Sequence, residues 1–327
     1  MTDKARVALG FVKRNATLAA FLFLIIFFSI ILPETFLTGR NLFNITQQMS
    51  MLMVTACAMT IVMAMGDFDL SVGSMASLVG IVAAVSFRGT GSESASFFVA
   101  LSIGLIGGAL NGFLVSYLNI LPFVATLGSL TIFSGCAFLI AGGKTIFGTE
   151  IPPHFSVFAR GGVPLMSAES FTLTLPNLTI VAAFILLLVW LLLSKKIFGR
   201  HLYAIGGNAE AALLAGIDVK RTRLIAFMLS GLGAALAGLM YMSRVASANP
   251  TQGAGLMLDA IAAVFIGMTM NHQGEPKVLN TLIGVLFLGI LSNGLTQLSV
   301  DSYVRDILVG ALIIMAVSAS RLEKLSR

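Results

Sequence analysis

The sequence predicts an all-α polytopic membrane protein, and two observations carry that prediction: the composition and the long apolar segments. Of the 327 residues, 57% are hydrophobic and 10% are charged, with a mean hydropathy of +0.97. Soluble domains carry about 25% charged residues. Apolar runs of about 20 residues, the length that crosses a bilayer as a helix, recur along the chain. The net charge of +6 does not indicate nucleic acid binding, because the basic residues lie beside the apolar runs, where the positive-inside rule accounts for them.

Ten apolar segments are candidate membrane spans. They lie at 16–33, 48–66, 70–87, 95–118, 122–142, 177–194, 223–243, 257–270, 278–297 and 303–320. The third and the eighth are short and are interrupted by Gly or Asp. Basic residues precede the first segment, as in a signal peptide, but PETF follows it in place of a small-residue cleavage site. We therefore expect a retained first helix.

Most of the 20 Lys and Arg residues fall on one side when the segments alternate from a cytoplasmic N-terminus. This predicts a single transmembrane domain over 1–327. Residues 1–15 and 321–327 are then cytoplasmic, 143–176 form a periplasmic loop, and 195–222 form the main cytoplasmic loop. Cys57 and Cys136 both fall in apolar runs, so we expect small buried side chains and no disulfide framework.

The chain carries a faint internal repeat. At an offset of 182 residues, four residues of the first half match four of the second: Gly107, Asn111, Gly112 and Gly128 correspond to Gly289, Asn293, Gly294 and Gly310. The matches place the fourth span on the ninth and the fifth on the tenth. Because five helices separate the partners, the two copies, helices 2–5 and 7–10, would have opposite orientations, as in many transporters.

Motifs of enzyme chemistry are incomplete in this sequence. None of the three His residues belongs to an H-E-x-x-H pattern. FLIAGGKT, at 138–145, ends like a phosphate-binding loop, but Phe138 stands where the first Gly is needed. The intramembrane serine and aspartyl protease patterns each lack a required Gly. The sequence thus predicts no catalytic residue, no metal site and no cofactor.

The stretch YAIGGNAEAALLAGIDVKRTR, residues 203–223, predicts a short helix outside the lipid. Asn208 suits the N-cap, and Glu210 lies at the positive end of the helix dipole. Ala and Leu follow, which favour helix, and Gly216 suits a left-handed C-terminal stop. A helix of about 12 Å is too short to be stable alone, so other contacts must hold it.

The residues of this short helix suggest two different faces. We expect one to pack on the rest of the chain, through Leu213, Leu214 and Ile217. The other would be a low, smooth surface on which another protein closes, formed by Ala209, Ala212 and Gly216. The alternative is a loop helix that packs on its own bundle and contacts no partner.

Several stretches together resemble the permeases of ribose-, xylose- and galactoside-type sugar ABC importers. The first is GRHLYAIGGNAEAALLAGIDVKRTR, which is similar to the cytoplasmic loop of that family. GDFDLSVGS (66–74), LPFVATLGSLTIFSGCAFLIAGG (121–143) and LSGLGAALAGLMYMSRVASANPTQGAGLMLDAIAAVFIG (229–267) resemble further segments, as do LGILSNGL (288–295) and LVGALIIMAV (308–317). The resemblance covers residues 60 to 320.

The resemblance implies a type II ABC importer-like permease in the bacterial inner membrane, translocating a sugar or polyol by alternating access. Its implied partners are an ABC ATPase subunit, a periplasmic sugar-binding protein, a second copy of the chain and membrane lipid. The short cytoplasmic helix would then be the coupling helix that contacts the ATPase. The residues implied in coupling are Gly207, Asn208, Glu210, Ala211, Ala212, Gly216 and Ile217.

Six polar residues near the spans are candidates for the translocation pathway or its gating: Asp67, Asp69, Ser71, Asn111, Asn293 and Asp259. Charge is costly inside a bilayer and tends to face water or a partner. Local roles are the alternatives: Asp69 and Ser71 both suit an N-cap of the third span, the two Asn residues suit interhelical hydrogen bonds, and Asp259 suits a pair with Arg244. A different function remains open, an ion-coupled secondary transporter of a small polar solute, whose proton carriers would be the three Asp residues.

One segment departs from the family pattern. Residues 267–276 read GMTMNHQGEP where the family carries a Gly-rich loop. Met270, Asn271, His272 and Pro276 differ from that pattern. Because this loop is predicted to be cytoplasmic, the departure bears on ATPase contact or gating more than on the choice of substrate.

Overall fold

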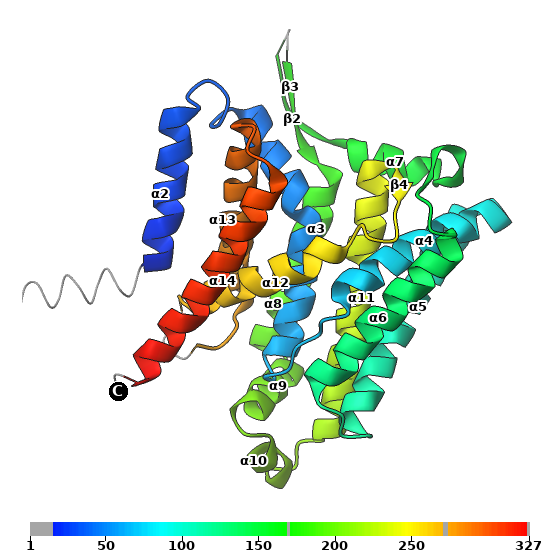
Figure 1. Cartoon of the computed structure of the whole chain (residues 1–327), viewed down its shortest axis with the longest axis vertical. Helices are drawn as coiled ribbons and strands as arrows, with labels where there is room; N and C mark the ends of the chain where they lie inside the picture. Colours follow the sequence, from blue (N-terminus) through cyan, green and yellow to red (C-terminus); the bar gives the residue numbers. More distant parts are fainter. Residues whose placement is uncertain (1–15, 169–170, 271–273, 326–327) are drawn as a thin grey trace, which may run out of the picture. The chain divides into compact units, whose positions relative to one another are not determined.

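The computed structural model describes residues 16–168, 171–270 and 274–325, and helices dominate these ranges (Figure 1). The chain divides into two compact units. Unit 1 comprises residues 1–49 and 262–327, and unit 2 comprises residues 50–261. The predicted cytoplasmic N-terminus, residues 1–15, lies outside the described residues, as do the last two residues of the C-terminal segment.

Each predicted span falls mainly within one helix of the structure. The helices are α2 (Ala16–Ile31), α3 (Gly39–Met63), α4 (Val72–Thr90), α5 (Glu93–Ser116), α6 (Pro122–Ala141), α8 (Asn177–Lys195), α11 (Val219–Val245), α12 (Ala254–Met268), α13 (Val278–Gln297) and α14 (Ser302–Leu325). Among the described residues, seven helices are long and apolar enough to cross a membrane: α3, α4, α5, α6, α8, α11 and α13. The chain is therefore a multi-pass helical membrane protein.

Two apolar helices are shorter than a typical span. α2 has 16 residues and α12 has 15. At 1.5 Å per residue, 15 residues extend about 22 Å, less than the roughly 30 Å of a hydrocarbon core. The sequence predicted the brevity of the α12 segment. Crossing of the bilayer by all ten segments stays a prediction.

The second helix begins earlier than its hydropathy indicates. The predicted apolar segment was 48–66, but α3 starts at Gly39. The hydroxyl oxygen of Thr38 accepts the backbone N–H of Asn41 at 3.2 Å, which satisfies an unpaired donor at the helix start. Hydropathy detects only the apolar part of a helix, so this polar first third was not part of the prediction.

The loop predicted at 143–176 contains strands, which an all-α prediction did not include. It holds β1 (Ile146–Phe147), the 3₁₀ turn η1 (Gly148–Glu150), α7 (Pro153–Arg160), β2 (Gly162–Ala168) and β3 (Phe171–Pro176). β2 and β3 pair as an antiparallel hairpin, and β1 pairs with β4 (Ser247–Ala248) after α11. In Figure 1 the hairpin lies at the opposite end of unit 2 from α9 (Ile197–Gly207) and α10 (Ala209–Leu214), which form the predicted cytoplasmic loop.

Glycines allow the helices of unit 2 to pack at close range. α5 and α11 touch along most of their shared length. A Cβ atom at Gly104 would lie 2.6 Å from the carbonyl oxygen of Gly231, and one at Gly233 would lie 2.6 Å from the Cβ of Ala58. A Cβ at Gly238 would overlap the carbonyl oxygen of Ala76. These positions therefore serve close packing, as in other membrane helix pairs.

Unit 1 uses small residues in the same way. A Cβ at Gly284 on α13 would overlap the carbonyl oxygen of Ala263 on α12. On another face of α13, a Cβ at Gly294 would overlap the ring of Phe28, which is 1% exposed on α2. α13 thus packs against both neighbours through positions that lack a side chain.

Candidate functional site

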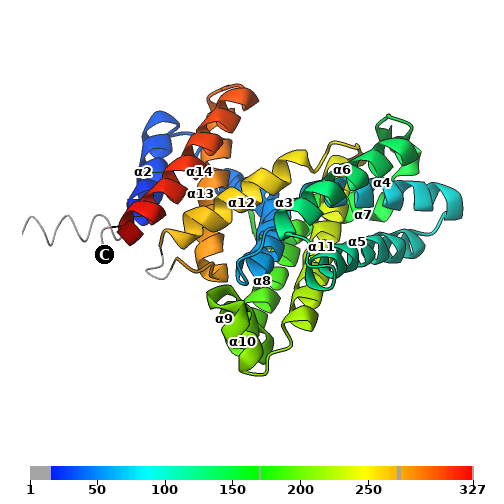
Figure 2. The same cartoon turned by 60° about the horizontal axis from the view of Figure 1, so that its bottom comes forward.

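The short helix predicted within residues 203–223 is present and begins where the sequence predicted. Figures 1 and 2 show α9 and α10 together at one end of unit 2. Between them Asn208 has an extended backbone, with φ of −160°, which ends one helix and starts the next. Its side-chain oxygen accepts the backbone N–H of Ala211 at 2.9 Å. The N-cap prediction is confirmed, and Glu210 lies in the first turn of α10.

The end of α10 also follows the prediction. Gly216 has a φ of +86°, in the left-handed region that favours glycine. Its N–H donates to Leu213 O at 2.9 Å, and the N–H of Ile217 donates to Ala212 O at 3.0 Å, which is the hydrogen-bond pattern of a Schellman motif. Asp218 then caps α11 by accepting the N–H of Arg221 at 2.9 Å. Caps at both ends hold a six-residue helix that would not persist alone.

The predicted packing side of α10 is wrong. Leu213 and Leu214 are 60% and 84% exposed, whereas Ala212 is 5% exposed. α10 packs on α9 and α11 through Ala212, whose small methyl group fits at the buried position. The leucines therefore point away from the chain.

The other residues implied in coupling surround this exposed pair. Gly207, Asn208, Glu210, Ala211 and Gly216 are exposed, and Ile217 is half-buried. Ala212 is the member of the set that the structure buries. The exposed surface of α10 thus consists of the two leucine side chains, Leu213 and Leu214, and the carboxylate of Glu210 on the same short helix.

A second set of predicted residues meets at the α3–α4 junction, which we define as residues 64–71. Asp69 is 1% exposed and Ser71 is 2% exposed. Oδ1 of Asp69 accepts the N–H of Ser71 at 3.0 Å and its hydroxyl at 2.6 Å, and Oδ2 accepts the hydroxyl of Ser230 on α11 at 2.7 Å. Burial raises the pKa of the Asp69 carboxyl, and the hydrogen bonds from Ser71 and Ser230 oppose that rise.

The same network continues into α5 and α6. Asn111, which is 1% exposed, donates from Nδ2 to the hydroxyl of Ser71 at 2.8 Å and accepts the hydroxyl of Ser129 at its Oδ1. Hydrogen bonds therefore connect Asp69, Ser71 and Asn111 across neighbouring helices. Their side chains are buried, so a solute cannot reach them in this structure. The interhelical hydrogen bond considered for Asn111 is confirmed. Ser71 lies at the N-cap position of α4, as considered from the sequence, but its side chain makes no capping hydrogen bond there.

Asp67, in the same junction, forms an ion pair with Arg223 on α11. Nε of Arg223 lies 3.0 Å from Oδ2 of Asp67, and Nη2 donates to Oδ1 at 3.3 Å. The Asp67 side chain is 7% exposed and the Arg223 side chain is 26% exposed. Burial raises the pKa of Asp67 to about 6, against the lowering effect of the Arg223 charge and hydrogen bond.

Asn293 is a buried polar residue of unit 1. It is 4% exposed on α13 and exchanges two hydrogen bonds of 3.0 Å with Asn41 on α3. Gln297 donates to the same Oδ1 at 2.8 Å. The interhelical role is thus confirmed for Asn293 as well. Asp259 is half-buried on α12, and its pairing with Arg244 stays a prediction.

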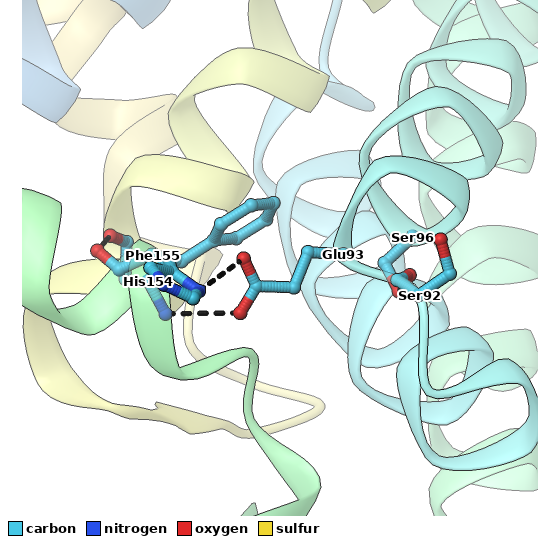
Figure 3. Close-up of polar contacts among 6 residues, drawn as sticks. Ser92, Glu93, Ser96, His154 and Phe155 are labelled. Carbon is cyan, nitrogen blue, oxygen red and sulfur yellow. Dashed lines mark hydrogen bonds and ion pairs between the residues drawn. The ribbon is translucent and has the colours of Figure 1, made fainter.

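A polar contact at the other end of unit 2 was not predicted from the sequence. Glu93, at the start of α5, points at the first turn of α7 (Figure 3). Its Oε1 accepts the backbone N–H of His154 at 3.0 Å, and its Oε2 lies 3.0 Å from Nδ1 of the same residue. The carboxylate therefore caps α7 from a different helix. Its partner is 61 positions away in the chain, so local sequence carries no signal for it.

Comparison with known proteins identifies the family. The family model described as "Branched-chain amino acid transport system / permease component" matches residues 41–317. A ribose import permease protein of Bacillus subtilis is 36% identical over 303 residues, 92% of this chain and 90% of the relative. A D-allose transport system permease protein of Escherichia coli is 33% identical over 291 residues (89% and 86%), and a probable ABC transporter permease protein of Sinorhizobium fredii is 33% identical over 287 residues (88% and 83%).

These matches cover nearly the whole chain and agree with the resemblance found in the sequence. They describe transport components, in which no catalytic residue is needed, so the chain is not an enzyme. They also remove the ion-coupled secondary transporter considered above, since one relative is itself described as an ABC transporter permease. The chain belongs to the family of branched-chain amino acid transport system permease components.

Proposed function

We propose that this chain is the membrane-spanning permease of an ABC importer that carries a sugar or related polyol into a bacterial cell. A periplasmic binding protein delivers the solute, and a separate ATPase subunit drives transport. Relatives described as ribose and D-allose permeases, at 36% and 33% identity, support a small polyhydroxylated solute. Because those two solutes differ, the names favour the class of sugar and do not select one member.

The exposed leucine pair of α10 carries the proposal of ATPase coupling. Leu213 and Leu214 project from a capped, rigid helix at one end of unit 2. Burying a leucine side chain is worth about 1.5–3 kcal/mol, so a partner that covers the pair gains binding free energy. Lys220 and Arg221 follow α10 closely, which favours the cytoplasmic side for this surface, where an ATPase has access to ATP.

A substitution at the more exposed leucine tests this coupling. Leu214→Asp places a charge in the proposed contact, while the caps of α10 and the buried Ala212 stay intact. We expect loss of ATPase co-purification and a drop in ATP-dependent uptake of at least about tenfold, as for the loss of an apolar anchor at an interface. Leu214→Met keeps the apolar bulk and is the matched control. Wild-type uptake by Leu214→Asp, with the ATPase still bound, would contradict the coupling role of α10.

We also propose that the chain is built from two inverted repeats, α3–α6 and α11–α14. Shifting α3, α4, α5 and α6 by 182 residues gives 221–245, 254–272, 275–298 and 304–323. The second set of helices spans Val219–Val245, Ala254–Met268, Val278–Gln297 and Ser302–Leu325. A single offset relating all four pairs supports the repeat that the glycine and asparagine matches indicated. The buried positions of Asn111 and Asn293 support it too.

The start of α4 and of α12 adds a local feature shared by the two halves. Oδ1 of Asp69 accepts both the N–H and the hydroxyl of Ser71, two residues on. Oδ1 of Asn249 accepts both the N–H and the hydroxyl of Thr251 in the same way, each at 2.8 Å. The two turns lie 180 residues apart and precede corresponding helices, as expected of repeated units.

The remaining features of the proposal rest on the family resemblance and on charge distribution. Both chain ends and the 195–222 loop are cytoplasmic, and the 143–176 loop is periplasmic. Two copies of the chain form the transport unit within the lipid of the inner membrane. The polar residues Asp67, Asp69, Ser71, Asn111, Asn293 and Asp259 act in gating rather than in direct contact with solute, which the burial of Asp69, Ser71 and Asn111 supports.

A further inference from the structure

The α3–α4 junction, residues 64–71, contacts both elements that flank α10, which are α9 before it and α11 after it. It follows α3 and leads into α4, and it has no regular secondary structure over residues 67–69. Two contacts connect the junction to the helices on either side of α10 in the chain. The first comes through α9, which precedes α10, and the second through α11, which follows it.

The contact through α9 is between backbones. A Cβ atom at Gly206 would overlap the carbonyl oxygen of Ala64 and would lie 3.2 Å from the Cα of Met65. Gly206 is the second-last residue of α9, so this contact lies directly beside the cap of α10. With no side chain between them, a displacement of α9 is transmitted to the junction without the slack of a flexible contact.

The contact through α11 is the ion pair of Asp67 with Arg223, at 3.0 and 3.3 Å. Arg223 is in the second turn of α11, just after the Asp218 cap that joins this helix to α10. The single hydrogen bond, from Nη2 of Arg223 to Oδ1 of Asp67, gives the contact a direction, and the closer approach of Nε to Oδ2 adds the attraction of opposite charges. The junction is thus connected to both ends of α10, through Gly206 on α9 before it and through Arg223 on α11 after it.

From the junction the contacts continue inward. Asp69, two residues after Asp67, bonds Ser230 on α11 and Ser71 at the start of α4. Ser71 bonds Asn111 on α5, which bonds Ser129 on α6. These hydrogen bonds are buried, so the junction cannot shift without either moving the helices or breaking bonds that water does not replace.

We propose that the α3–α4 junction transmits movement of α10 to α4, α5 and α6, and that Asp67 and Arg223 are the positioning residues of this transmission. The inference rests on the proposed function, since it concerns how the coupling contact at α10 reaches the solute pathway. It goes further by assigning a role to a pair of residues that lies on neither the ATPase surface nor the buried network. Breaking the pair separates ATP hydrolysis from solute movement while both partners stay assembled.

The experiment compares uptake per ATP hydrolysed in the permease–ATPase complex reconstituted in vesicles, with the binding protein and radiolabelled ribose added. Asp67→Asn and Arg223→Gln each remove one charge. We expect ATPase co-purification to be retained. Uptake per ATP should fall by about tenfold, which is within the range of fold-changes that typical coupling between two sites produces. The exchanged pair Asp67→Arg with Arg223→Asp restores the ratio. Arg221→Gln, an exposed charge two residues away, is the matched control and keeps the wild-type ratio.

Hydrogen exchange gives a readout that does not depend on transport. In the wild-type complex, we expect a non-hydrolysable ATP analogue to change the hydrogen-exchange protection of residues 64–71. In Arg223→Gln we expect that change to be lost while the change in protection at α10 remains. Uptake per ATP and junction protection that are the same in Arg223→Gln as in the wild type would overturn the inference alone. A wild-type complex that neither hydrolyses ATP nor takes up solute would overturn the proposed function and, with it, the inference.

Discussion

At the residue scale, Asp69 is the point on which the buried polar contacts of unit 2 converge. Its two carboxylate oxygens accept three hydrogen bonds, from Ser71 and Ser230, and the residue is 1% exposed. An amide in its place offers one oxygen and directs an NH₂ group at a donor. We expect Asp69→Asn to lower the free energy of unfolding by about 1–3 kcal/mol, because a buried donor loses its acceptor. Thermal unfolding of the purified protein in detergent measures this.

The control for Asp69→Asn is the same change at an exposed carboxylate. Asp306 on α14 has a side chain that is 72% exposed and lies 3.7 Å from Arg305. Exposed ion pairs contribute about 0–1 kcal/mol, so Asp306→Asn should melt close to the wild-type temperature. Equal melting temperatures for the two variants would show that the buried network does not stabilise the fold.

How far the site could be predicted depends on the distance along the chain between interacting residues. Asn208 and Gly216 were predicted correctly because their bonds reach residues within five positions. The partner of Asp69 on α11 is 161 residues away, and that of Asp67 is 156 residues away, so no local pattern specifies them. The outward direction of Leu214 depends on which neighbour covers α10, and the sequence of the loop does not contain that information.

At the scale of elements, the α5–α11 pair holds unit 2 together through positions that lack side chains. A Cβ at Gly108 would overlap the carbonyl oxygen of Phe227 and would lie 2.9 Å from the Cα of Met228. These are backbone atoms that cannot rotate away. We expect Gly108→Ala to destabilise the protein by about 1–3 kcal/mol, as for overpacking of a core. Chemical unfolding in mixed micelles, followed by circular dichroism, measures the change.

A second helical glycine provides the comparison for Gly108→Ala. Gly128 on α6 has no atom within 4 Å of an added Cβ, and its φ is not in the left-handed region. Gly128→Ala should be neutral or slightly stabilising, because alanine favours the helix. If both variants lost the same amount of stability, helix propensity rather than the close approach of α5 and α11 would be the cause.

Elements were predicted unevenly, and the reason is the physical signal that each leaves in the sequence. Membrane helices carry long apolar runs, so each of the ten predicted segments falls mainly within one helix. In the 143–176 loop, β1 and β2 show no strict alternation, so they leave no comparable signal, whereas β3 reads FTLTLP, an alternation of apolar and polar residues that indicates a strand and that the all-α prediction missed. The prediction missed the polar first turns of α3, which include Asn41. A polar side chain lowers the hydropathy of a segment, but the Asn41 amide is hydrogen-bonded to Asn293 within the protein.

At the scale of the whole molecule, the proposed repeat and the membrane orientation are linked. Two related halves separated by an odd number of spans must have opposite orientations, so the side assigned to one loop fixes the sides of the others. Within unit 2, the α7–hairpin end and the α9–α10 end lie far apart (Figure 1). The charge distribution predicts that the α9–α10 end is cytoplasmic. A labelling experiment at these two ends therefore tests the orientation of the whole chain.

Single cysteines at Val157 and Leu214 provide that test. These side chains are 69% and 84% exposed on α7 and α10, so a thiol at either position reacts with a maleimide without unfolding. In a chain with Cys57→Ala and Cys136→Ala, produced in cells that lack the ATPase subunit so that nothing covers α10, a membrane-impermeant maleimide added to spheroplasts should label Val157→Cys at once. It should label Leu214→Cys only after the membrane is permeabilised. Labelling of Leu214→Cys in intact spheroplasts would place α10 outside the cell, where no ATPase subunit can bind, and would reverse the predicted orientation of every span.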